Sequence, residues 1–138
     1  AAAVNAIAAD GIYMTPRLVY GMVDTNLSVQ ETEENTGEKV MEPTTAARLR
    51  AYMESTARFG TARFGAPQNC VSGIKTGTAQ TGVYDENGEE IENYWYAGYI
   101  CNAQEEPLYT LVVLEETAGE MHVPQAFRKI GEALVDFN

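Results

Sequence analysis

The chain has 138 residues, 45% of them hydrophobic, which is enough for one folded domain with a core of its own. Its formal net charge of −11 argues against nucleic acid or an anionic membrane surface as the main partner. No apolar run approaches the roughly 20 residues of a membrane span. The N-terminal alanines follow no basic segment, so we expect no signal or anchor within the chain.

Residues 1–9 predict a helix that ends before Gly11. No N-cap residue precedes this helix, and we therefore expect the chain to be a piece of a longer protein.

Residues 18–23 predict a short strand that follows a loop containing Pro16. A second extended segment, residues 39–41, is expected to pair with it as a peripheral hairpin. The acidic segment 31–38 would connect the two as a solvated loop, with Asn35-Thr36-Gly37 as its turn residues.

A second helix is predicted to start at Thr44 and Thr45 and to end at Gly60. Its apolar residues recur at helical spacing, at Ala46, Leu49, Met53 and Ala57. A short tandem repeat follows, with the sequences Ala57-Arg58-Phe59-Gly60 and Ala62-Arg63-Phe64-Gly65. It is either a basic, aromatic binding loop or a loop with two buried phenylalanines, and we favour the second interpretation.

Three strands are predicted next, at residues 70–80, 94–102 and 108–114. The connections between them are polar and turn-forming, so consecutive antiparallel hairpins are expected. The nearly all-apolar third strand is expected inside the sheet, and the glycine-containing first strand at its edge.

The chain closes with apolar residues at helical spacing, which predict a helix that packs on the sheet: Val123, Phe127, Ile130, Leu134 and Phe137. His122, just before it, is expected to be a surface or capping residue. Cys70 and Cys101 fall on neighbouring predicted strands, where free thiols are expected. No metal or other cofactor is predicted, because the possible soft ligands are few and irregularly spaced.

The fold class is therefore α+β: an antiparallel three-stranded meander, with a peripheral hairpin, packed by a C-terminal helix. Residues 1–138 form one unit, with helices and a loop or hairpin region in 1–69, and the meander and last helix in 70–138.

The first strand of the meander carries the chemistry. It contains the lysine ammonium of Lys75, the hydroxyls of Thr76 and Thr78, and the bare backbone of Gly77. Glycine inside a strand usually marks a bulge or the close approach of a ligand or another backbone. These residues predict a site for a negatively charged group. Gly73 is expected to serve packing on the opposite side of the strand.

Lys75-Thr76-Gly77-Thr78 resembles the K-T-G motif of penicillin-binding proteins and serine β-lactamases. The surroundings strengthen this resemblance, because further segments occur in the order found in penicillin-binding protein transpeptidase domains. They are residues 4–11, 16–19, 43–49, 75–80, 95–99, 108–114 and 127–130. The chain resembles the C-terminal part of such a domain, of the class B, cell-division or sporulation type, and so a partial transpeptidase fold.

The resemblance implies a D,D-transpeptidase that cross-links peptidoglycan stem peptides through a serine acyl-enzyme, and β-lactams would acylate the same serine. Lys75 would lie beside the nucleophile and take part in proton transfer. The hydroxyls of Thr76 and Thr78 would bind the substrate carboxylate, the Thr78 N–H would form half of the oxyanion hole, and Gly77 would leave room for substrate along the strand. The whole protein would act at the extracytoplasmic face of the bacterial membrane, held there by an anchor outside these residues.

Two motifs of the family are missing, a Ser-x-x-Lys on a helix and a Ser-x-Asn. Ser72 and Lys75 have the first spacing, but residues three apart in a strand point to opposite faces. We therefore expect the chain to be inactive alone. The alternatives are a β-lactam sensor or β-lactamase domain of the same fold, or a non-catalytic interaction module.

Overall fold

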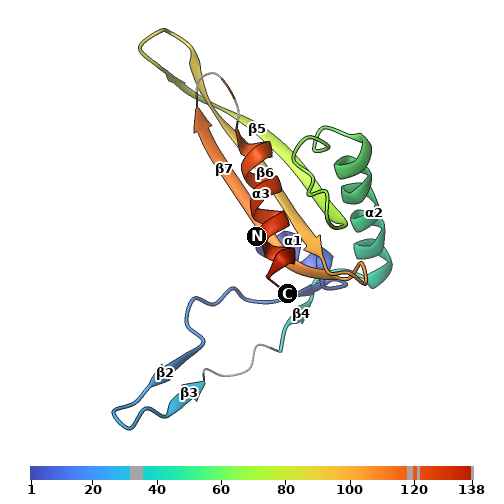
Figure 1. Cartoon of the computed structure of the whole chain (residues 1–138), viewed down its shortest axis with the longest axis vertical. Coiled ribbons are helices and arrows are strands. Elements are labelled where there is room, and N and C mark those ends of the chain that lie inside the picture. Colours follow the sequence, from blue (N-terminus) through green and yellow to red (C-terminus); the bar gives the residue numbers. More distant parts are fainter. Residues whose placement is uncertain (32–35, 118–119, 121, 138) are drawn as a thin grey trace.

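The computed structural model describes residues 1–31, 36–117, 120 and 122–137 (Figure 1). The elements follow one another as α1 (Ala2–Ala8), β1 (Ile12–Tyr13), β2 (Gly21–Val23), β3 (Val29–Glu31), β4 (Glu38–Lys39), α2 (Pro43–Phe59), β5 (Ser72–Tyr84), β6 (Glu90–Cys101), β7 (Pro107–Thr117) and α3 (Val123–Asp136). The α+β class is confirmed, and so are the predicted N-terminal, central and C-terminal helices. No helix among the described residues is long and apolar enough to cross a bilayer.

The three long strands form an antiparallel sheet in the order β5-β6-β7, which confirms the predicted meander. The prediction that the third strand lies inside the sheet is wrong, because β7 pairs only with β6 within the described chain. Its apolar sequence has another cause. Both α1 and α3 pack on β7, so both of its faces are covered although one of its edges is not.

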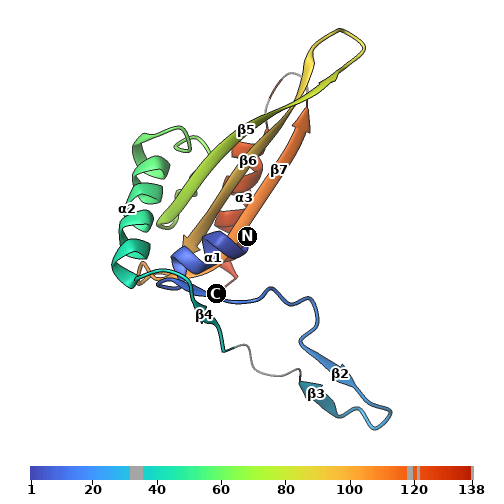
Figure 2. The same cartoon turned by 180° about the vertical axis from the view of Figure 1, so that it is seen from behind.

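Helices cover both faces of this sheet, and Figures 1 and 2 show α3 and α1 on opposite sides of it. On the α3 side, Phe127 packs with Ile74, Tyr96 and Ile100, all of which are buried. On the α1 side, Tyr99 and Cys101 pack with Met53 of α2 and with apolar residues of α1. The helix α2 runs beside β5 and contributes Ala57 to the first cluster and Met53 to the second.

The buried stripe of α3 repeats every four residues and includes Val123, Phe127 and Gly131. The prediction that Ile130 and Phe137 belong to it is wrong, since they are 42% and 89% exposed. A Cβ atom on Gly131 would lie 2.6 Å from Pro67 Cγ, so the helix approaches the loop closely at the glycine. Hydrophobic periodicity missed this position because glycine has no side chain to count.

A carboxylate from the sheet caps the start of α3. Glu115 of β7 accepts hydrogen bonds from the backbone N–H groups of His122 and Val123, both at 2.6 Å. Although desolvation opposes ionisation, these hydrogen bonds hold the pKa of Glu115 below its usual value. The His122 ring lies 3.0 Å from the same carboxylate and is exposed, which confirms the expected surface location of His122.

The N-terminal pairings differ from the prediction. The strand β2 pairs with β3, and β4 pairs with β1, so residues 18–23 do not pair with 39–41. Asp24 closes the β2-β3 turn by accepting hydrogen bonds from the N–H groups of Asn26 and Ser28. The turn at Asp24 joins β2 to a strand that is closer in the sequence than residues 39–41. Asn35, which was expected as a turn residue, lies outside the described residues.

The tandem repeat exposes its aromatic rings. Phe59 and Phe64 are 73% and 62% exposed, whereas Ala57 and Ala62 are 4% and 0% exposed, so the prediction of two buried phenylalanines is wrong. The arginine that precedes each phenylalanine lies over its ring, at 5.3 and 4.1 Å from the ring centroid. The small alanines, and not the aromatic rings, occupy the core positions of this segment.

Candidate active site

The candidate site lies on β5 at the point where the strand leaves the core. Ser72, Gly73 and Ile74 are buried, whereas Lys75 and Thr78 are exposed. As predicted, β5 is an edge strand, with β6 as its only partner strand among the described residues. Within the segment from Lys75 to Thr78, the first and last residues are exposed, and Thr76 and Gly77 between them are half-buried.

Alternation divides the four residues between the faces of the sheet. Lys75 and Gly77 pair with Ala97 and Trp95, on the face that α1 covers. Thr76 and Thr78 pair with Tyr96 and Tyr94, on the face of α3. The Lys75 ammonium donates a hydrogen bond to the carbonyl oxygen of Thr76, so the long side chain bends back along the strand. A ligand can contact residues of both faces only along an edge of the sheet, and β5 is an edge strand.

The two glycines of this strand have different environments. A Cβ atom on Gly73 would lie 2.4 Å from the ring of Tyr99, so the fold requires a glycine there. A Cβ atom on Gly77 would meet only Trp95, at an ordinary contact distance of 3.5 Å. Gly73 serves packing as expected, but on the same face as Gly77 and not on the opposite one, because residues four apart in a strand share a face. Packing alone does not explain Gly77.

The structure adds Thr61 to the site, a residue that the sequence did not indicate. Its Oγ1 lies 2.9 Å from Oγ1 of Thr76. Thr61 belongs to the loop after α2, between the two copies of the repeat. No local sequence pattern predicts a contact between a loop and a strand that are 15 residues apart.

Ser72 cannot act with Lys75. The two residues pair with Ile100 and Ala97, on opposite faces of the sheet, and Ser72 is only 5% exposed. The structure therefore supports the rejection of this pair as a nucleophile and its base.

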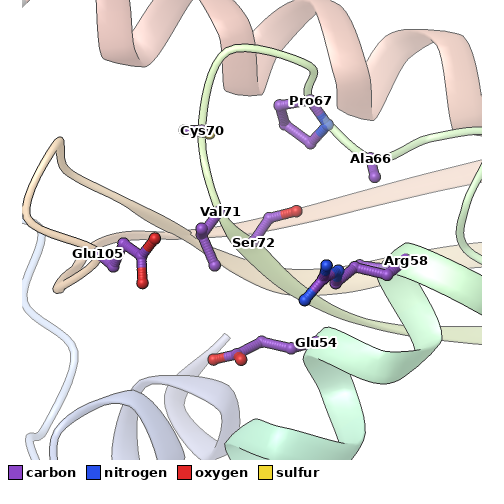
Figure 3. A pocket seen from close by; sticks show the side chains of 9 residues that line it. Glu54, Arg58, Ala66, Pro67, Cys70, Val71, Ser72 and Glu105 are labelled. Carbon is purple, nitrogen blue, oxygen red and sulfur yellow. The ribbon is translucent and has the colours of Figure 1, made fainter.

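A cavity of about 360 Å³ lies at the buried end of β5, away from the four residues of the candidate site (Figure 3). Cys70, Val71 and Ser72 line it on one side, and Glu54 and Arg58 of α2 on the other. Both cysteines are free thiols, as expected. Burial raises the pKa of Cys70, and raises that of Cys101 to about 11, so both thiols are protonated at neutral pH.

The described residues bring no three potential His, Cys, Asp or Glu ligands together around a metal position. The groups that the candidate site offers to a ligand are the ammonium of Lys75, the hydroxyls of Thr61, Thr76 and Thr78, and the backbone at Gly77.

The Lys-Thr-Gly-Thr segment thus lies on the edge strand of a helix-covered antiparallel meander, with Lys75 and Thr78 exposed. The chain belongs to the penicillin-binding protein transpeptidase domain family, whose sequence model matches residues 1–132. No curated protein is matched by its sequence.

Solved structures of similar fold agree with this assignment. The D,D-transpeptidase domain of a peptidoglycan glycosyltransferase from Eggerthella lenta is 26% identical, with a TM-score of 0.75 over 96% of this chain and 30% of that one. Penicillin-binding protein A from Mycobacterium tuberculosis, an imipenem acyl-enzyme complex, is 24% identical, with a TM-score of 0.75 over 96% and 29%. Penicillin-binding protein 3 from the same organism, complexed with ampicillin, is 20% identical, with a TM-score of 0.81 over 99% and 33%. The chain thus spans about a third of the length of these structures.

Proposed function

We propose that the chain supplies the K-T-G wall of the active site of a D,D-transpeptidase, which cross-links peptidoglycan stem peptides through a serine acyl-enzyme. The observation that carries this proposal is the position of Lys75 to Thr78 on the edge strand β5, with Lys75 and Thr78 exposed, in a chain that belongs to the transpeptidase family. The acyl-enzyme and ampicillin complexes of the similar structures support the same chemistry. The nucleophilic serine would come from outside these 138 residues.

Each residue of the segment has a proposed role. The Lys75 ammonium lies beside the serine, where it assists proton transfer and attracts the carboxylate of a D-Ala-D-Ala stem peptide or a β-lactam. The hydroxyls of Thr76 and Thr78 donate hydrogen bonds to that carboxylate. The Thr78 N–H stabilises the oxyanion of the tetrahedral intermediate, and one donor of this kind is typically worth about 10²–10³ in rate.

The open backbone at Gly77 lets the substrate lie along β5 as an added strand. A Cβ atom there would clash with none of the described residues, so its effect would fall on the bound substrate. A protein that acts on peptidoglycan would work at the extracytoplasmic face of the membrane, and we propose this location for the whole protein.

A fluorescent penicillin tests the proposal. We expect the full-length protein to be labelled covalently and the isolated 138-residue chain to remain unlabelled. In the full-length protein, Lys75→Ala should abolish labelling. The matched control is Lys39→Ala, which removes an exposed lysine of β4 whose ammonium forms an ion pair with Glu42.

Labelling of the isolated chain would overturn the assignment of the nucleophile to another part of the protein. Near-normal labelling of the Lys75→Ala variant would refute the role of Lys75. Rapid loss of the label would identify a β-lactamase, and no labelling of the full-length protein would favour a non-catalytic module.

A further inference from the structure

The hydroxyl of Thr76 has a hydrogen-bond partner within the chain. Thr61 Oγ1 lies 2.9 Å from Thr76 Oγ1, and either hydroxyl can be the donor. Within the described chain, neither hydroxyl makes another hydrogen bond. The direction in which the Thr76 hydroxyl proton points therefore depends on Thr61.

Three neighbouring contacts fix the position of Thr61. Gly60 caps the C-terminus of α2, and the next residue after Thr61, Ala62, is fully buried in the core. The phenol of Tyr96 donates a hydrogen bond to the Thr61 carbonyl at 3.3 Å. Tyr96 also pairs with Thr76 across the sheet, so the same residue positions both threonines.

The phenol of Tyr96 keeps the proton that it donates to the Thr61 carbonyl. Burial raises the pKa of its phenol, so the phenol stays protonated over the physiological pH range. Its ring is 3% exposed and packs against Phe127 at a centroid distance of 5.8 Å. The loop that carries Thr61 is thus anchored to the core and not merely resting on the strand.

The chemistry of a hydroxyl decides the direction of the Thr61–Thr76 hydrogen bond once an anion is present. A threonine hydroxyl has one proton to donate and two lone pairs that accept. If Thr76 gives its proton to a carboxylate, it can only accept from Thr61. Hydrogen bonds in such a chain also polarise and strengthen one another.

We propose that Thr61 is a positioning residue for substrate binding: its O–H donates to Thr76 Oγ1 and so directs the Thr76 proton toward the substrate carboxylate. This inference rests on the proposed function, because it takes the carboxylate of a stem peptide or β-lactam as the ligand. Thr61 itself need not touch the substrate. Its contribution is specific for a ligand that carries the carboxylate.

The test compares benzylpenicillin with its methyl ester, which lacks the negative charge. Second-order acylation rates of the full-length protein are measured with each compound by intact-protein mass spectrometry. We expect Thr61→Val, which removes the hydroxyl but keeps the shape, to slow acylation by benzylpenicillin about three- to tenfold, the worth of one hydrogen bond. The rate with the ester should change less than about twofold, and Thr61→Ser should restore the normal ratio of the two rates.

Matched controls separate this inference from the proposed function. Thr56→Val removes a hydroxyl that bonds to the Tyr52 carbonyl within α2, and it should leave both rates unchanged. Thr76→Val should show the same selective loss as Thr61→Val. The ratio of the two rates does not depend on how much of a variant is folded, so a poorly folding variant still gives an answer.

Equal changes with both compounds in Thr61→Val, or no change, would overturn the inference while Thr76→Val remained selective. If Thr76→Val were itself unselective, the proposed carboxylate site would fall, and the role of Thr61 with it. A wild-type protein that reacts with neither compound would refute the proposed function as a whole.

Discussion

The two halves of β5 belong to one strand and share one partner, yet they differ in their surroundings. At the base, Ser72 to Ile74 are buried by helices on both faces of the sheet. Toward the tip, Val83 and Tyr84 are 55% and 62% exposed, and the β5–β6 hairpin extends beyond the helices (Figure 1). The segment from Lys75 to Thr78 lies at the boundary. The comparison shows that the end of helical cover, rather than any change in the strand itself, produces the candidate site.

The largest change in the free energy of unfolding is expected from shortening a side chain at the buried base of β5. Ile74→Ala removes a side chain that is 0% exposed, and it should destabilise the chain by about 2–5 kcal/mol through lost burial and a new cavity. Urea unfolding of the 138-residue chain measures this. Ile130→Ala is the matched control, since Ile130 is 42% exposed, and a similar loss at both positions would contradict the boundary between buried and open residues.

Gly73 and Gly77 allow the buried and the exposed part of β5 to be compared with the same substitution. Gly73→Ala should cost about 1–3 kcal/mol, because its Cβ would overlap the Tyr99 ring. Gly77→Ala should change the free energy of unfolding by less than about 0.5 kcal/mol, yet it should slow acylation of the full-length protein by penicillin. Equal destabilisation by the two substitutions would show that Gly77 is a packing residue.

Glu115, which caps the start of α3, lies at the same level of the sheet as Thr78, since both residues pair with Tyr94. The pKa of Glu115 is lowered in the folded chain, so its stabilising effect is complete above its unfolded value near 4.5 and is lost as the pH falls through the lower folded value. Glu115→Gln should therefore cost about 1 kcal/mol at neutral pH.

The measurement is urea unfolding of both proteins at neutral pH and below pH 4.5. The difference between wild type and Glu115→Gln should shrink in acid. A difference that stays constant with pH would show that the charge of Glu115 does not stabilise the helix.

The smallest effect is expected at the tip. Val83→Thr keeps the β-branched shape and exposes a hydroxyl where the side chain is already 55% exposed, so the free energy of unfolding should change by less than about 0.5 kcal/mol. Thermal unfolding followed by circular dichroism is sufficient to check this. A loss above 1 kcal/mol would indicate that the tip is covered by another part of the chain.

The sequence predicted most of the body of this fold because its signals are local. Helical spacing in 46–57, polar turns between the strands and the glycine-rich K-T-G strand are each contained within a few residues. The predictions failed where packing decides between local alternatives. The alanines of the repeat are buried in place of the phenylalanines, and Gly131 lies close to Pro67, whereas Ile130, which was expected to pack on the sheet, is 42% exposed.

The candidate site shows the same division. Lys75 to Thr78 could be found as a motif, and their edge position could be inferred from composition. Thr61 could not be found, because its contact with Thr76 arises only when the loop after α2 folds onto β5.

The hydrogen bond from Thr110 Oγ1 to Asn5 Oδ1, at 3.4 Å, joins residues that are 105 positions apart. The β5–β6–β7 meander, by contrast, forms through hairpins between consecutive strands. Since closing a longer loop costs more entropy before any contact is gained, we expect the meander to form first and α1 to dock last during folding. Pulsed hydrogen exchange should then protect the amides of β6 before those of α1, and simultaneous protection would refute this order. The face of the sheet that α1 covers would thus be the last part of the core to be completed.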